Sequence, residues 1–170
     1  IGNMKIAFIG GGNMGEAIIG ALLGKKLAKP KNITVSDISE ARRDYLKKKY
    51  GVGVTASNQE AIAGKDVIVL AVKPQQMNEV LVEIKGVIKP AQLVISIAAG
   101  IKISTISQGL AHKNIVRSMP NTPAQLGLGM TGWTATPEVT GEQKELARKI
   151  LGAMGKEIYF DKEETLDIVT

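Results

Sequence analysis

Glycine residues dominate the stretch "FIGGGNMGEA", residues 8–17, which follows directly on an apolar run. Gly10, Gly12 and Gly15 have the G-x-G-x-x-G spacing. Between a strand and a helix, the first glycine permits a tight turn, the second lets backbone approach a pyrophosphate, and the third lets helix and strand pack closely. The helix N-terminus then offers N–H groups to the anion. The stretch therefore predicts a dinucleotide site, with a ligand-free turn as the alternative; the spacing assigns no task to Gly11.

Asp37 follows a second apolar run, 22 positions beyond the last glycine of that spacing. An acidic residue there accepts hydrogen bonds from an adenine ribose, and its charge disfavours a 2′-phosphate, which favours NAD. Ser36 and Ser39 are able to donate to such a phosphate, however, and Arg42 or Arg43 to neutralise it. These residues leave the choice between NAD and NADP open. Asp37 as a simple turn residue is the alternative.

Three further segments follow predicted strands, where ligands of doubly wound folds bind. They are "AVKPQQ" at 71–76, "SIAAG" at 96–100 and "RSMPNTPAQLGLG" at 117–129. In the third, Pro120 and Pro123 restrict the backbone around Asn121 and Thr122, which fits the rigid presentation of an amide and a hydroxyl. An ordinary strand end and a proline-braced connection are the alternatives.

Common catalytic sets are missing from the sequence. His112 is the only histidine, and its polar surroundings "GLAHKN" predict a solvated loop residue rather than a catalyst. We find no Ser-His-Asp set, HExxH or paired-carboxylate motif, and the absence of cysteine excludes disulfides and thiolate metal sites. The residues assign no catalytic group and predict no metal site.

Short β-branched runs alternate with helical patterns, which is typical of βαβ units. Strands are expected at 5–9, 33–36, 52–55, 66–72, 93–96, 115–117, 130–135 and 157–160, the last at a sheet edge; helices are expected at 13–23, 40–50, 57–64, 76–85, 104–110 and 142–154. Ser39, Ser57 and Thr140 are predicted N-caps. The fold class is therefore α/β: a Rossmann-like, doubly wound, mostly parallel sheet with helices on both faces.

The 170 residues suffice for one well-cored domain, and the formal net charge is +6. The lysine clusters at 25–31 and 47–49 fit a solvated face or the attraction of an anionic ligand. Few aromatic residues are present and none is interleaved with these clusters, which disfavours nucleic acid. No apolar stretch reaches the ~18 residues of a membrane span. With no secretion signal and no cysteine, we expect a cytoplasmic protein without membrane partners.

The chain divides into three parts. Residues 1–3 precede Met4 and are interpreted as a cloning remnant. Residues 4–161 form the expected dinucleotide-binding domain. Residues 162–170 turn polar and place Leu166 and Val169 at helical spacing, which predicts the start of a helix that leads into an absent domain.

Four segments together, "IAFIGGGNMGEAI", "DVIVLAVKPQQM", "VISIAAGI" and "RSMPNTPA", resemble the pyrroline-5-carboxylate reductase family. The resemblance runs in order from about Met4 to Thr170. The joint presence of "AVKP", "S-x-AAG" and "MPNTP" is much more specific than the glycines alone. The end "ETLDIVT" is similar to the lead-in to that family's "SGSGPAY" segment, which this sequence lacks.

The resemblance implies an NADP(H)-binding Rossmann domain followed by a helical domain that forms dimers and completes the substrate site. It implies reduction of a small molecule, 1-pyrroline-5-carboxylate, to proline by NADPH, with NADH as the alternative, in the last step of proline biosynthesis. The full-length protein would be a homo-oligomer built from dimers. The implied contacts are Ile9, Gly10, Gly11, Gly12, Asn13 and Met14 for the pyrophosphate; Asp37, Ser39 and Asn58 for the adenosine end; Ala71, Val72, Lys73, Pro74, Ile97, Ala98 and Ala99 along the dinucleotide; and Asn121 and Thr122 on the nicotinamide and substrate side. The sequence departs from the expected pattern at Asp37, where a residue suited to a 2′-phosphate is expected.

The implied chemistry needs no resident acid. The protonated cyclic imine already carries positive charge, so hydride transfer mainly needs orientation and exclusion of water. This chain by itself is expected to bind NADP(H) weakly without turnover. A β-hydroxyacid dehydrogenase, whose opening resembles "GGGNMG", and a non-catalytic dinucleotide-binding module are the alternatives.

Overall fold

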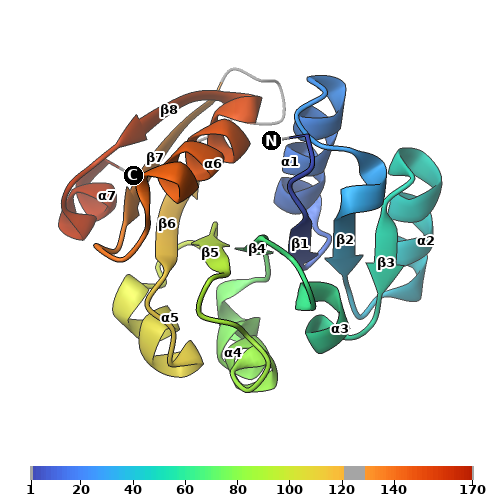
Figure 1. The fold of residues 1–170 in the computed structure, drawn as a ribbon, viewed down its shortest axis with the longest axis horizontal. Coiled ribbons are helices and arrows are strands. Elements are labelled where there is room, and N and C mark those ends of the chain that lie inside the picture. Colours follow the sequence, from blue (N-terminus) through green and yellow to red (C-terminus); the bar gives the residue numbers. More distant parts are fainter. Residues whose placement is uncertain (1, 121–128, 170) are drawn as a thin grey trace.

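A single twisted sheet organises the chain (Figure 1). The computed structural model describes residues 2–120 and 129–169. Eight strands lie in the order β3-β2-β1-β4-β5-β6-β7-β8. They are β1 Ile6–Ile9, β2 Ile33–Ser36, β3 Gly53–Thr55, β4 Val67–Leu70, β5 Leu93–Ser96, β6 Ile115–Pro120, β7 Gly129–Ala135 and β8 Gly155–Tyr159. The helices are α1 Asn13–Gly24, α2 Glu40–Tyr50, α3 Asn58–Ile62, α4 Met77–Ile84, α5 Ile103–Leu110, α6 Gly141–Leu151 and α7 Glu163–Val169, with 3-10 turns η1 Pro30–Asn32, η2 Pro74–Gln76 and η4 Gly152–Met154.

The first six strands of the sheet all pair in parallel. Strand β7 pairs antiparallel with β6, and β8 runs parallel to β7 at the sheet edge. The order of the first six is that of doubly wound dinucleotide-binding sheets, and the connections reverse direction between β1 and β4. The predicted fold class is confirmed, and this reversal creates the crevice in which such folds bind ligands.

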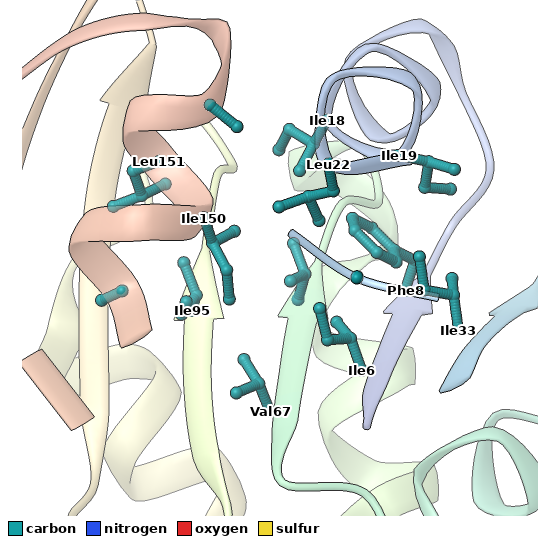
Figure 2. Packing of buried hydrophobic residues seen from close by; sticks show 14 of the residues in the cluster. Ile6, Phe8, Ile18, Ile19, Leu22, Ile33, Val67, Ile95, Ile150 and Leu151 are labelled. Atoms are coloured by element: carbon teal, nitrogen blue, oxygen red, sulfur yellow. The ribbon is translucent and has the colours of Figure 1, made fainter. Parts of the chain in front are cut away.

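Continuous apolar strands arise because helices cover both faces of the sheet. Successive side chains of β1 alternate between two cores: Phe8 belongs to the cluster that includes α1, α2 and α6, and Ile9 to the cluster with α3, α4 and α5. Figure 2 shows the first cluster, in which Ile18 of α1 and Ile150 of α6 lie over the strands. Because these strands are parallel, the two cores hold the carboxyl ends of β1, β2, β4 and β5 side by side at one end of the sheet.

The structure extends some predicted elements and divides one. Strand β6 continues past 117 to Pro120 because it pairs with β7, Pro120 lying opposite Thr131. The helix expected at 142–154 is α6 followed by a separate 3-10 turn, η4. The predicted N-caps are present: the hydroxyls of Ser39, Ser57 and Thr140 each accept a backbone N–H in the first turn of α2, α3 and α6.

Helix α7 is attached to the sheet by a buried arginine. The Arg117 side chain of β6 is 1% exposed and lies 2.9 Å from Glu163 and 2.8 Å from Asp167 of α7. Its Nε has no hydrogen-bond partner among the residues that the structure describes. The apolar Leu166 is also fully buried, next to Gly132 of β7. Helix α7 therefore docks beside β6 and β7 through both charge and apolar contact.

The expectation of a solvated His112 is wrong. Its side chain is buried, and Nε2 lies 2.7 Å from the carbonyl oxygen of Gln92, just before β5. Helix α5 ends at Ala111 in the left-handed conformation, with φ of 50°, and this turns the chain so that the imidazole faces inward. The polar residues next to His112 in the sequence did not indicate this burial, because its hydrogen-bond partner Gln92 lies 20 residues away in the chain.

In residues 2–120 and 129–169, no helix is long and apolar enough to cross a bilayer.

Candidate dinucleotide site

The turn after β1 requires glycine at its first position. Gly10 has a φ of 99°, and a Cβ there would lie 2.9 Å from the carbonyl carbon and oxygen of Ala71. The end of β4 passes this close because the Ala71 N–H donates to the Ile9 carbonyl at 2.8 Å. Both the backbone conformation and the contact exclude a side chain. The tight turn that the glycine spacing predicts is therefore present.

The second and third glycines of the spacing differ in what surrounds them. A Cβ on Gly15 would lie 3.1 Å from the Gly10 carbonyl oxygen, so a side chain there would push helix α1 away from the turn. A Cβ on Gly12 would meet no atom of the described residues within 4 Å. The fold itself places no demand on Gly12, and its open surface is where a ligand can approach the backbone.

Gly11, which the spacing left without a task, is enclosed by α2 and β2. A Cβ there would lie 2.7 Å from Leu46 Cδ1, 3.2 Å from Val35 Cγ1 and 3.3 Å from Asp37 Oδ2. A side chain at Gly11 would therefore displace the Leu46 side chain, because the second strand and second helix pack against the turn. Leu46, the buried residue of the mostly charged helix α2, was the sign of this in the sequence.

Helix α1 begins at the turn without a capping side chain. Its N-cap is Gly12, and no side chain in the described part of the protein caps it. The N–H groups of Gly10 and Gly11 are used within the fold: they donate to the Ser36 carbonyl at 2.8 Å and to Asp37 Oδ2 at 2.9 Å. The donors left for an anion are those of Gly12 and the first helical residues.

Asp37 closes the turn after β2 with both carboxylate oxygens. Oδ2 accepts from the Gly11 N–H, and Oδ1 accepts from the Ser39 N–H at 2.8 Å. The carboxylate therefore joins the glycine turn to the start of α2. Each oxygen retains a lone pair, so its predicted contact with an adenine ribose is compatible with this geometry and stays a prediction.

The two arginines of α2 have different partners. Arg42 Nε donates to the Gly11 carbonyl oxygen, and Nη2 lies 2.6 Å from Glu16 Oε1. Arg43 Nη1 instead donates to the Asp37 carbonyl at 2.8 Å, which places it at the end of β2. The sequence left both arginines as candidates for neutralising a 2′-phosphate, whereas the structure ties Arg42 to the glycine turn.

Glu16, in the first turn of α1, collects four donors. Its Oε2 accepts from Tyr50 Oη at 2.6 Å, from Tyr45 Oη at 2.9 Å and from Lys49 Nζ at 3.2 Å. Desolvation by itself would raise its pKa, but the hydrogen bonds from Tyr50, Tyr45, Arg42 and Lys49 together lower the pKa to about 2. Sequence reasoning missed this cluster, which we call the Glu16 cluster: Glu16, Arg42, Tyr45, Lys49 and Tyr50.

The other predicted residues of the adenosine side gather near the end of β2. The Ser36 hydroxyl donates to Asn58 Oδ1 at 2.6 Å, and Asn58 Nδ2 donates to Glu83 at 3.0 Å. Ser39 caps α2. Ile38 between Asp37 and Ser39 is 87% exposed, a large apolar side chain that sequence reasoning did not single out. Its full exposure at this place offers an apolar surface to a flat ring.

The predicted residues along the dinucleotide follow β4 and β5, whose ends lie in register with Leu70 opposite Ser96. Ala71 contacts the glycine turn, and the chain continues through Val72 and Lys73 into η2 at Pro74. After β5, the Ile97 N–H donates to the Leu70 carbonyl at 3.1 Å, and Ala98 and Ala99 follow. The structure therefore brings these two segments to one edge. Asn121 and Thr122 lie outside the described residues.

Residues 5–100 match the family model described as NADP oxidoreductase coenzyme F420-dependent. The pyrroline-5-carboxylate reductase of Vibrio alginolyticus is 44% identical over 97% of this chain and 61% of its own length. The structure of a pyrroline-5-carboxylate reductase from Coxiella burnetii superposes with a TM-score of 0.94 at 37% identity, over 98% of this chain and 62% of that one.

A third comparison adds a coenzyme complex. The Plasmodium falciparum pyrroline carboxylate reductase, solved with NADP bound, has a TM-score of 0.87 at 30% identity and covers 100% of this chain and 62% of its own. The resemblance indicated by the four sequence segments is confirmed, and the chain spans about 61% of the length of the curated relatives it matches. Since the family model matches more than half of the residues, the chain belongs to the family described as NADP oxidoreductase, coenzyme F420-dependent.

Proposed function

We propose that this chain is the coenzyme-binding domain of a pyrroline-5-carboxylate reductase and that it holds NADPH. The observation that carries the proposal is the glycine turn at the reversal of the sheet, where Gly12 is open and α1 starts without a capping side chain. The similarity to reductases along the whole chain supports the substrate, and the NADP complex of the Plasmodium falciparum relative supports the coenzyme. The reaction is reduction of 1-pyrroline-5-carboxylate to proline.

The chain's residues bind and orient the coenzyme. The N–H groups of Gly12, Asn13 and Met14 hold the pyrophosphate at the start of α1. The backbone from Ala71 to Pro74 and from Ile97 to Ala99 supports the nicotinamide half. Asn121 and Thr122, outside the described residues, are proposed contacts of the nicotinamide and substrate. The bound coenzyme supplies a hydride from its reduced nicotinamide ring. The acceptor carbon of the protonated imine needs only correct placement and a dry site, so no acid of this chain has to move a proton.

The choice of NADPH over NADH rests on the relatives, and the surroundings of Asp37 are compatible with it. Its carboxylate is directed toward the Gly11 and Ser39 N–H groups, and Arg43 lies against its carbonyl oxygen. A cation at the end of β2 favours a 2′-phosphate. NADH remains the alternative coenzyme.

The substrate carboxylate is assigned to the portion of the reductases that this chain does not span. That portion is also proposed to make the full-length protein a homo-oligomer built from dimers. The cytoplasm is the proposed location, and neither nucleic acid nor a membrane is a proposed partner.

Turnover of the full-length protein tests the function. We expect NADPH absorbance to fall when 1-pyrroline-5-carboxylate is added. When β-hydroxyacids are supplied with NADP⁺ instead, we expect no NADPH to form. This chain alone should bind NADPH without turnover, because the substrate carboxylate is assigned to the portion of the reductases that it does not span. Oxidation of a β-hydroxyacid would favour a dehydrogenase instead. Binding of NADPH without turnover of either substrate by the full-length protein would favour a non-catalytic dinucleotide module.

A further inference from the structure

We propose that Arg42, held by Glu16, is a positioning residue that aims the pyrophosphate-binding turn, and that it is not a ligand of the coenzyme. The inference rests on the proposed coenzyme site and adds a residue whose side chain acts through the backbone of that site. It follows from the contacts of the Gly11 peptide groups, from the anchoring of Arg42 and from the position of Glu16.

The peptide group between Gly11 and Gly12 is held by Arg42 on the side that faces α2. Arg42 Nε donates to the Gly11 carbonyl oxygen, which therefore faces α2. In a trans peptide the carbonyl and the next N–H point in opposite directions. The Gly12 N–H is thereby directed away from α2. On the preceding peptide, the Gly11 N–H is bound by Asp37, so the turn is fixed at both peptides.

Arg42 is itself anchored along its whole length. Its backbone N–H donates to the Ser39 hydroxyl at 3.2 Å in the first turn of α2. Its guanidinium lies 2.6 Å from Glu16 Oε1 and 5.0 Å from the ring centre of Tyr45. The side chain is 25% exposed. The Arg42 guanidinium therefore has partners on both α1 and α2, whereas the Arg43 guanidinium donates to the Asp37 carbonyl oxygen at the end of β2.

The charge of Glu16 must be neutralised if Glu16 is to hold Arg42 beside an anion site. A carboxylate in the first turn of α1 lies close to the place proposed for the pyrophosphate, and by itself it would repel that anion. The Arg42 guanidinium neutralises it at 2.6 Å, whereas Lys49 lies farther away at 3.2 Å and is half exposed to solvent. Glu16 can therefore act as the fixed anchor of Arg42 without opposing the ligand.

The two roles that Arg42 could have predict different coenzyme effects. A ligand of the 2′-phosphate acts on NADP⁺ and leaves NAD⁺ unaffected. A residue that aims the pyrophosphate turn acts on both coenzymes equally, because both carry the same pyrophosphate. The ratio of the two affinity losses therefore separates positioning from direct binding.

The test compares Arg42→Met with Lys49→Met in this chain. Lys49 contacts the same Glu16 carboxylate, and its side-chain hydrogen bonds within the described residues go to Glu16 and Tyr45 rather than to the glycine turn, so it is a matched control. We expect Arg42→Met to lower the affinities for NAD⁺ and NADP⁺ by the same factor, about tenfold or more, because a charge-assisted hydrogen bond is lost. Lys49→Met should change either affinity by about twofold at most. Calorimetric titration gives the dissociation constants.

A second readout reports on the turn without coenzyme. The backbone amide resonance of Gly12 in a ¹H–¹⁵N spectrum should shift in Arg42→Met and in Glu16→Gln, and stay in place in Lys49→Met. Thermal unfolding confirms that each variant is folded at the temperature of the titration. A merely structural role of Arg42 would lower the melting temperature without moving the Gly12 amide or the affinities of the folded protein.

Several results would overturn the inference. They are a loss confined to NADP⁺, an equal loss in Lys49→Met, and an unshifted Gly12 amide in Arg42→Met. Failure of the unsubstituted chain to bind either coenzyme would count against the proposed function instead. In that case the Gly12 resonance still decides whether Arg42 sets the geometry of the turn.

Discussion

The Gly11 N–H donates a 2.9 Å hydrogen bond to the carboxylate of Asp37, and this bond joins two segments that lie 26 residues apart. Asp37 therefore stabilises the glycine turn directly. The same carboxylate accepts the Ser39 N–H at the start of α2. The relationship explains why an acidic residue is present at the end of β2 even where the proposed coenzyme carries a 2′-phosphate.

Replacing Asp37 should loosen both turns. In Asp37→Ala the Gly11 and Ser39 N–H groups lose their acceptor, and we expect the free energy of unfolding to fall by about 1–3 kcal/mol. Asp37→Asn keeps one oxygen acceptor and should lose less. Urea unfolding of the two variants measures the difference. Unchanged stability in Asp37→Ala would show that water replaces the carboxylate without cost.

Gly10 and Gly12 should respond to alanine in opposite ways. Gly10→Ala places a Cβ 2.9 Å from the Ala71 backbone at a φ of 99°, so we expect a loss of about 2 kcal/mol or more in unfolding free energy. Gly12→Ala meets no described atom within 4 Å and should stay within about 0.5 kcal/mol of the original stability. Its affinity for NADPH should nevertheless fall about tenfold, because the methyl group occupies the approach to the pyrophosphate. Unfolding curves and coenzyme titrations of both variants check the contrast, which equal stability losses would contradict.

The attachment of α7 should depend on charge compensation at Arg117. Glu163→Gln together with Asp167→Asn leaves the buried guanidinium without a counter-ion, and we expect a destabilisation of about 3 kcal/mol. Adding Arg117→Met to that pair should recover most of the loss, since an apolar side chain of similar length replaces the unpaired charge. Guanidinium unfolding of the double and triple variants measures the recovery. A triple variant no more stable than the double would show that the ion pair itself, and not the burial of charge, holds α7.

The stability of the Glu16 cluster should depend on pH in the acid range. The pKa of Glu16 is lowered from 4.5 to about 2 in the folded chain, so folding favours the ionised form. Its stabilising contribution is complete above about pH 4.5 and is lost as the pH falls toward 2. The difference in unfolding free energy between the original chain and Glu16→Gln should therefore shrink over this interval. Denaturant unfolding at a series of pH values gives the difference, and a constant gap would show that ionisation of Glu16 does not matter.

Local patterns determined the fold class and part of the site. The continuous apolar runs of β1, β4 and β5 identify strands covered on both faces, and the spacing of Gly10 and Gly15 identifies a tight strand-to-helix turn. The caps at Ser39 and Thr140 were equally predictable. These features depend on residues that are neighbours in the sequence, so a few consecutive residue types are enough to predict them.

Contacts between distant segments needed the tertiary structure. Leu46 lies against Gly11, Arg42 reaches the turn only when α2 packs beside α1, and His112 is buried and contacts the Gln92 carbonyl just before β5. No short sequence motif predicts these contacts. The sequence by itself determined where the chain turns and what kind of ligand the turn accepts; packing across elements decided which side chains hold that turn in place, because it sets the distances between residues far apart in the chain.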